Sequence, residues 1–168
     1  LISEEIGEKY FGNKEVINKI SSKLIVDPVD GSTNASRGIP FSCISLAYAE
    51  GNSLDSISKA VILDFKSKDI YWAEKGKGAF HNDNRILVSK NTWDDELLFE
   101  VDFNTSNLTK ELSKYRRIIE KISKTRVMGS CALSLCLLAS GCIDCYFDFR
   151  KDVRLVDFAA GYLIIKEA

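Results

Sequence analysis

The 168-residue sequence contains no apolar run of about 18 residues, which is the length that a membrane-spanning helix needs. It also lacks a basic segment leading into a short apolar one, so neither a spanning helix nor a signal peptide is predicted. An excess of one charge sign is missing as well, because 23 basic and 24 acidic residues give a formal net charge of -1. We therefore expect a cytoplasmic protein with a small partner, and neither nucleic acid nor a membrane.

Histidine is nearly absent, and we expect the single His81 to be a surface residue in a hairpin turn rather than a catalytic base. The 5 cysteines lie among apolar neighbours, which favours buried reduced thiols over a disulfide framework. Cys142 and Cys145 could form a redox or zinc-binding pair. No second Cys or His pair accompanies them, and their surroundings indicate a strand.

The strongest pattern is the decapeptide 25–34, Ile-Val-Asp-Pro-Val-Asp-Gly-Ser-Thr-Asn. Apolar residues end a strand, and Asp27 and Asp30 follow around a proline that fixes the local backbone. Gly31 permits a sharp bend, and the polar residues after it are typical of helix caps and turns. Paired acids followed by free amides can hold a hard cation beside an anion. The alternative is a turn in which both acids only cap the chain.

Apolar patterning predicts strands and helices along the rest of the chain. Expected strands are 23–26, 43–49, 60–65, 70–74, 86–89, 97–103, 126–128 and 143–149, and expected helices are 108–122, 132–139 and 156–166. This predicts a hairpin-rich α+β part over residues 1–95 and an α/β part over 96–168. The chain opens on Leu1 inside a strand and ends within a helical pattern, so we expect further elements at both ends.

Three segments resemble, in order, the inositol monophosphatase and fructose-1,6-bisphosphatase superfamily of lithium-sensitive, magnesium-dependent phosphomonoesterases. The decapeptide resembles its signature Asp-Pro-(Ile/Leu/Val)-Asp-Gly-(Thr/Ser), and segment 156–161 resembles Trp-Asp-x-Ala-Ala-Gly. Between them, Arg126-x-x-Gly129-Ser130, an apolar helix and Ser140-Gly141 follow the family pattern. The resemblance covers essentially the whole chain and implies a layered α-β-α-β sandwich, α+β to α/β in class, truncated at both ends.

The resemblance also implies a metal site made of oxygen donors. Its ligands would be the side chains of Glu4, Asp27, Asp30 and Asp157 and the carbonyl of Val29. Hard oxygen ligands favour Mg²⁺ over zinc, and roughly two or three ions per site are expected, with Asp27 bridging two of them. Taken alone, Glu4 and Glu5 would fit a solvated turn, and Asp157 an ordinary helix cap.

Catalytic and phosphate-binding roles are likewise implied by the resemblance. The catalytic residues would be Glu4, Asp30 and Ser32, with Glu4 and the Ser32 hydroxyl orienting and deprotonating the attacking water. Ser32 takes the place usually held by Thr. The amides of Gly31, Ser32 and Thr33 would hold the phosphate oxygens.

For the substrate alcohol, the resemblance implies Gly129, Ser130 and Asp148, with Asp148 binding sugar or inositol hydroxyls. The segment after Asp148 is longer and more basic than in dedicated inositol phosphatases. Arg150 and Arg154 could meet a second phosphate, as in archaeal dual-specificity enzymes, or could form a solvated basic turn. Two departures from the family pattern, Ala35 for an aromatic residue and Val156 for Trp, fall at expected packing positions.

The expected function is therefore a Mg²⁺-dependent phosphomonoesterase that hydrolyses inositol monophosphate, fructose 1,6-bisphosphate or both. Its partner would be a small phosphorylated polyol or sugar, and the resemblance suggests a homodimer. One alternative is a nucleotide 3′-phosphatase. Another is a non-catalytic regulatory or assembly module of the same fold, against which the intact set of acids argues.

Overall fold

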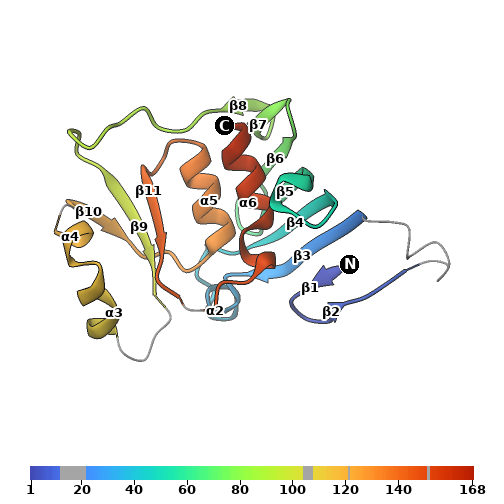
Figure 1. Cartoon of the computed structure of the whole chain (residues 1–168), viewed down its shortest axis with the longest axis horizontal. Coiled ribbons are helices and arrows are strands. Elements are labelled where there is room, and N and C mark those ends of the chain that lie inside the picture. The colour runs from blue at the N-terminus through green and yellow to red at the C-terminus, as the bar shows by residue number, and fades with distance from the viewer. Residues whose placement is uncertain (12–21, 104–107, 121, 151) are drawn as a thin grey trace.

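The computed structural model describes residues 1–11, 22–103, 108–120, 122–150 and 152–168. Two sheets enclose a pair of helices, α5 (Cys131–Ala139) and α6 (Leu155–Glu167), as Figure 1 shows. Two short helices, α3 (Leu108–Lys114) and α4 (Arg116–Ile119), lie on the outer side of the smaller sheet (Figure 1). This alternation of layers is the α-β-α-β sandwich that the resemblance implied.

The larger sheet has eight strands in the order β2-β1-β3-β4-β5-β6-β7-β8. Its strands are β1 (Ile2–Ser3), β2 (Gly7–Glu8), β3 (Ser22–Asp30), β4 (Cys43–Glu50), β5 (Ile57–Asp64), β6 (Ile70–Glu74), β7 (Gly78–His81) and β8 (Asn84–Ile86). Neighbours from β3 to β8 pair antiparallel, whereas β1 runs parallel to β3. Small residues on one face, among them Ala47, Ala60 and Ala73, are buried, so that α6 packs closely against the sheet.

The smaller sheet is parallel, with β9 (Leu98–Asp102) between β10 (Lys124–Arg126) and β11 (Cys145–Asp148). The ring of Phe99 is fully buried and stacks on Phe147 with ring centroids 5.8 Å apart. Parallel strands end at the same edge of a sheet, and the register places Asp148 beside Asp102 there. Two acids from separate strands therefore meet at the edge that faces α6.

Close packing joins α5 to α6. A Cβ added to Gly161 of α6 would lie 2.4 Å from Cδ1 and 2.6 Å from Cβ of Leu135 in α5. Only glycine permits this approach without a shift of one helix. The two helices also bring the first turn of α6, with Asp157, close to the start of α5, which begins after Ser130.

Four local expectations were wrong. The strand expected at 23–26 continues to Asp30. The strands expected at 86–89 and 126–128 lie at Asn84–Ile86 and Lys124–Arg126 instead. The helix expected over 108–122 is interrupted at Tyr115, which has φ -110° and ψ 17° and packs its ring on Phe149, with centroids 4.6 Å apart. Residue 121 of that expected helix lies outside the described residues.

Two further elements are short, α2 (Ser32–Arg37) and a 3-10 turn at Leu54–Ser56. Within the described part of the chain, no helix has the length and apolar character required to cross a bilayer. The larger sheet precedes residue 95 and the smaller one follows it, while α6 from the second part packs on the first sheet. The division into two parts at residue 95 stays a prediction.

Candidate metal and phosphate site

A bulge in β3 turns Asp27 and Asp30 to the same face of the sheet. In a regular strand, residues three apart point to opposite faces. Here Pro28 and Val29 together stand opposite Ile44 of β4, so one extra residue restores the phase of the side chains. Both carboxylates are buried, Asp27 at 1% and Asp30 at 8% exposure. A bulge also tolerates Pro28, which has no N–H to give to the ladder.

The start of α5 holds the carboxylate of Asp30. The hydroxyl of Ser130 donates a hydrogen bond of 2.5 Å to Oδ2 of Asp30, and the backbone N–H of Ala132 donates one of 2.7 Å to the same oxygen. Ser130 is the N-cap of α5, so its hydroxyl also accepts from the N–H of Leu133 at 3.4 Å. The orientation of Asp30 therefore depends on the first turn of α5.

The turn after Asp30 is packed tightly against two other segments. Gly31 has φ 77°, and a Cβ there would lie 2.8 Å from the carbonyl oxygen of Phe41. Asn34 in α2 donates hydrogen bonds of 2.8 Å from Nδ2 to the carbonyls of Phe41 and Met128. These contacts tie the decapeptide to the segment that leads into α5, which lies about a hundred residues later in the chain.

Asp157 enters the same region from the first turn of α6 and is 2% exposed. Its Oδ2 accepts a hydrogen bond of 3.1 Å from the backbone N–H of Arg154, so the capping role expected of an acid at this position is real. The guanidinium of Arg154 also lies between two acids, 3.1 Å from Oδ1 of Asp157 and 2.7 Å from Oε1 of Glu4. Glu4, after β1, is thereby joined to α6.

The carboxylates perturb one another. Burial, and next the charges of Asp30 and Glu4, raise the pKa of Asp27 to about 7, although the N–H of Val29, 3.0 Å away, opposes this shift. The pKa of Asp30 is also raised, chiefly by burial, against the hydrogen bonds from Ser130 and Ala132. Like charges held together in a buried place favour protonation unless a cation is bound.

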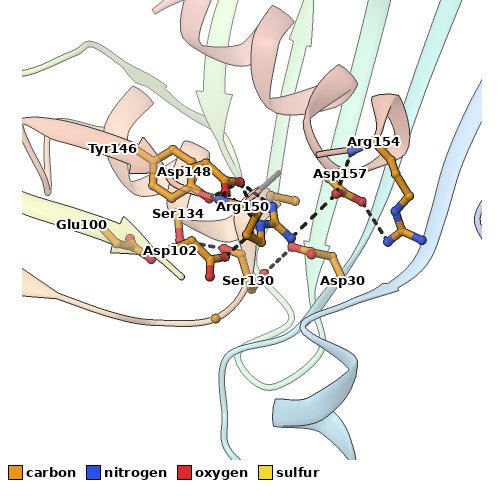
Figure 2. A network of polar contacts seen from close by, with 12 residues as sticks. Asp30, Glu100, Asp102, Ser130, Ser134, Tyr146, Asp148, Arg150, Arg154 and Asp157 are labelled. Carbon is orange, nitrogen blue, oxygen red and sulfur yellow. Dashed lines mark hydrogen bonds and ion pairs between the residues drawn. The ribbon is translucent and has the colours of Figure 1, made fainter. Parts of the chain in front are cut away.

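A second group of acids surrounds Arg150, as Figure 2 shows. Its Nε lies 3.0 and 2.9 Å from the two oxygens of Asp148, and its Nη2 lies 2.5 Å from Oδ2. Asp102, at the end of β9, lies 3.7 Å from Nε, and Asp157 lies 3.7 Å from Nη1. Arg150 therefore connects the ends of β9 and β11 with the start of α6.

The structure brings together most of the residues that the sequence singled out, through the contacts described above: Glu4, Asp27, Asp30, Ser130, Asp148, Arg150, Arg154 and Asp157. Ser32 and Thr33 lie at the exposed start of α2, and Gly129 packs against Asn34. In the described ranges, no three acidic, His or Cys side chains are arranged closely enough to enclose a metal ion. The ligand and catalytic roles of all these residues stay predictions.

Comparison with known proteins decides the family. The sequence model of the inositol monophosphatase family matches residues 1–168. The chain belongs to the inositol monophosphatase family. The resemblance inferred from the three motifs is thus confirmed, and so is the fold, which this family shares.

Individual relatives agree with the family assignment. A fructose-1,6-bisphosphatase/inositol-1-monophosphatase from Methanothermobacter thermautotrophicus is 36% identical over 100% of this chain and 60% of its own length. A bifunctional NADP phosphatase/NAD kinase from Methanococcus maripaludis is 34% identical over 100% of this chain and 31% of its own length. The crystal structure of the extragenic suppressor protein suhB from Bartonella henselae has a TM-score of 0.83 and 28% identity, over 99% of this chain and 61% of that one.

The chain spans only part of such family members. It covers 60% of the Methanothermobacter protein and 61% of the Bartonella one. The activity and substrates of the whole protein are therefore matters for proposal.

The chemistry of the donor set fits a hard divalent cation. All candidate side-chain donors are carboxylate oxygens, which Mg²⁺ prefers, and burial, followed by neighbouring negative charges, raises the pKa values of Asp27 and Asp30. Two of the candidate ligands, Glu4 and Asp157, are currently bridged by Arg154. Cation binding by both acids together would therefore require that guanidinium to move.

Sequence reasoning missed Asp102 and Asn34. Asp102 lies beside Asp148 in the parallel register of β9 and β11, and both acids pair with Arg150. Asn34 joins the decapeptide to the segment before α5. A signal for Asp102 was present, because Glu100 and Asp102 interrupt an otherwise apolar strand. Asn34 could not be distinguished from an ordinary turn residue, since its partners lie far away in the sequence.

Proposed function

We propose that this family member is a Mg²⁺-dependent phosphomonoesterase acting on a small phosphorylated polyol or sugar. The observation that carries the proposal is a group of three buried carboxylates beside the helix start that orients Asp30. Asp30 interacts electrostatically with both Asp27 and Asp157, although the three have to move closer to enclose an ion. Without a cation, ionised Asp27 is unfavourable in this place, because burial and next the charges of Asp30 and Glu4 raise its pKa.

In this proposal, Glu4, Asp27, Asp30, Asp157 and the Val29 carbonyl hold the metal. Bound Mg²⁺ would neutralise the phosphate dianion and lower the pKa of an attacking water. Glu4, whose side chain is 29% exposed, would accept the proton of that water once Arg154, now 2.7 Å from its Oε1, has moved away. The Ser32 hydroxyl at the exposed start of α2 would orient the same water.

Phosphate binding is assigned to the backbone amides of Gly31, Ser32 and Thr33. The first N–H groups of a helix have no acceptor within the helix, so those at the start of α2 are available to an anion. Gly31 also keeps the turn narrow, because a side chain there would collide with the Phe41 carbonyl.

The alcohol part of the substrate would lie between Gly129, Ser130 and Asp148. The relatives named inositol-1-monophosphatase and fructose-1,6-bisphosphatase support inositol monophosphate and fructose 1,6-bisphosphate as substrates. Arg150 and Arg154 are the candidates for contact with a second phosphate. In this structure their guanidinium groups pair with acids, so they would have to exchange these partners for phosphate oxygens.

A second candidate is the dephosphorylation of a nucleotide, in line with the nucleotide alternative considered from the sequence. The 34% identity to a protein named as an NADP phosphatase/NAD kinase supports it. Homodimerisation and a cytoplasmic location also remain predictions. Light scattering coupled to size-exclusion chromatography measures the first.

Phosphate release with and without Mg²⁺ tests the proposal, using inositol 1-phosphate, fructose 1,6-bisphosphate and NADP as substrates. We expect Mg²⁺-dependent release from one or both of the first two. Release from NADP alone would favour the nucleotide candidate. No release from any of them, with metal binding intact, would favour the non-catalytic module.

A further inference from the structure

Glu100 is a buried acid that the proposed reaction does not use. It lies in β9, the central strand of the smaller sheet, and is 1% exposed. Its neighbours Phe99 and Val101 point to the opposite face of the sheet, so the Glu100 side chain faces α5, where it contacts Ser134. Its second carboxyl oxygen, Oε2, has no hydrogen-bond partner among the described residues. An ionised carboxylate in such a place is costly.

The hydrogens available around Ser134 favour a proton on Glu100. The Ser134 hydroxyl is within hydrogen-bond reach of Oε1 of Glu100 and also lies 2.6 Å from the carbonyl oxygen of Ser130. A hydroxyl has one hydrogen, and both of these partners are acceptors when Glu100 is ionised. If Glu100 is protonated, its O–H donates to Ser134, and Ser134 donates to the Ser130 carbonyl. Each contact is then satisfied.

This chain of hydrogen bonds ends at Asp30. The carbonyl of Ser130 receives the Ser134 hydroxyl, while the hydroxyl of Ser130 donates to Oδ2 of Asp30 at 2.5 Å. Ala132, in the same turn, donates its N–H to the same oxygen. Figure 2 shows Glu100, Ser134, Ser130 and Asp30 in this order, from β9 through α5 to β3.

We propose that Glu100 is a positioning residue, held protonated in the interior, which fixes the first turn of α5 and through it the carboxylate of Asp30. Its effect on metal binding rests on the proposed function, whereas its protonation does not. Burial, the largest cause, and the charge of Asp102 on the same strand raise the pKa of Glu100 to about 7, against the hydrogen bonds that Ser134 and the backbone N–H of Met128 would donate to the ionised carboxylate.

Few other titratable groups face this side chain. Asp102 is two residues away on the same face of β9, and Tyr146 of β11 is directly beside Glu100 in the sheet register. On the other side, Arg126 of β10 is in register, but its side chain is exposed and donates to the Thr125 carbonyl. The ion pairs between described residues do not include Glu100.

Unfolding measurements over pH 4 to 9 test the protonation, with Glu100→Gln as the comparison. Gln is isosteric with the neutral acid and can donate its amide hydrogen to Ser134. A group with a raised pKa stabilises the fold fully below its unfolded pKa and loses that contribution as the pH rises through its folded pKa. The wild-type protein should thus lose stability relative to Glu100→Gln from about pH 4.5 to about pH 7, and the difference should then level off. A difference that does not vary with pH overturns the proposal.

Metal titration tests the link to Asp30. Ser134→Ala removes the bridging hydroxyl and should weaken Mg²⁺ binding about tenfold, which is the usual size of outer-shell effects. The matched control is Ser140→Ala at the other end of α5, where the hydroxyl donates to the Cys136 carbonyl at 2.8 Å; there we expect no change. Equal affinities for Ser134→Ala and the control overturn the positioning role.

The pH dependence of Mg²⁺ affinity separates the two parts of the hypothesis. Ionisation of Asp27 and Asp30 affects the wild-type protein and Glu100→Gln alike. The ratio of their Mg²⁺ affinities should therefore stay near one at pH 6 and shift several-fold in favour of Glu100→Gln above pH 7, and a constant ratio contradicts the proposal. If the wild-type protein binds no Mg²⁺ at all, the proposed function fails, and the unfolding measurements still decide whether Glu100 is protonated.

Discussion

The two sheets deliver acids to one region in different ways and leave them in different electrostatic states. In the larger sheet, a bulge within β3 turns Asp27 and Asp30 inward, where neither makes a direct ion pair with an arginine among the described contacts. In the smaller sheet, parallel strands end together and place Asp102 and Asp148 around Arg150.

This difference indicates which acids are available to an added cation. Asp148 already has a bidentate partner in Arg150, which is 20% exposed and remains charged at any relevant pH. Asp27 differs from Asp148, because the neighbouring charges that act on it most strongly, those of Asp30 and Glu4, are also acidic. The acids of the bulged strand β3 can therefore bind a cation from solution. The acids at the ends of β9 and β11 are already paired with the guanidinium of Arg150.

The largest effect is expected when a charge is removed from the bulged strand. Asp30→Asn keeps an oxygen that can accept from Ser130 or Ala132 but loses the negative charge. We expect phosphate release at saturating Mg²⁺ to fall by at least about a thousandfold, or about 4 kcal/mol of transition-state stabilisation, with the fold intact by circular dichroism. Asp83→Asn, in the exposed turn between β7 and β8, is the control, and full activity of Asp30→Asn would falsify the metal assignment.

Asp27→Asn should show how much it costs to bury this acid beside Asp30 and Glu4. Because the pKa of Asp27 is raised to about 7, its contribution to stability is complete below about pH 4 and is lost as the pH rises through 7. Without Mg²⁺, the Asn variant should therefore be more stable than the wild-type protein at pH 8, on the order of 2 to 4 kcal/mol, and the gain should vanish near pH 4.

Urea unfolding with EDTA at both pH values measures this gain. The Asn oxygen can still accept the N–H of Val29, which keeps the bulge intact. Equal stability of the two proteins at pH 8 would mean that burial of this acid is compensated in some other way, and the contrast between the sheets would then be lost.

Arg150→Ala should leave the acids of the smaller sheet without a positively charged partner. Asp102, Asp148 and Asp157 would lose their shared cation, and unfolding stability at pH 7 should fall by about 2 to 3 kcal/mol. Arg116→Ala, which breaks an exposed pair with Glu120, should cost less than about 1 kcal/mol. If the two losses are equal, Arg150 is no more important than a surface arginine.

The same Arg150 variant tests substrate choice. Loss of its guanidinium should raise the KM for fructose 1,6-bisphosphate more than that for inositol 1-phosphate, because only the former has a second phosphate. Equal losses for both substrates remove Arg150 from specificity and leave it the task of pairing with Asp148.

The smallest effect is expected from a change in the helix layer, α5 and α6, which lies between the two sheets. Gly161→Ala would place a methyl group against Leu135 and should destabilise the protein by about 1 to 3 kcal/mol. Because α6 carries Asp157 and α5 orients Asp30, Mg²⁺ affinity should also fall. Chemical denaturation and calorimetric titration measure these two losses, and a variant equal to the wild-type protein in both would show that the helices can move apart freely.

Local sequence determined the pieces of this protein. The decapeptide, the helix after Ser130 and the helix that begins before Asp157 were found from composition and spacing, because each depends on neighbours within a few residues. Together they were sufficient to identify the family, and the layers of the fold followed from that resemblance.

Only the tertiary structure decided how the pieces meet. The bulge in β3 is defined by its pairing with β4, where two residues of β3 stand opposite one of β4. The contact of Asp102 with Arg150 depends on the parallel register of β9 with β11. The proton proposed on Glu100 follows from Ser134, which lies on another element. The partners in these features lie tens of residues apart in the chain. A pattern within one segment therefore cannot predict that they come into contact.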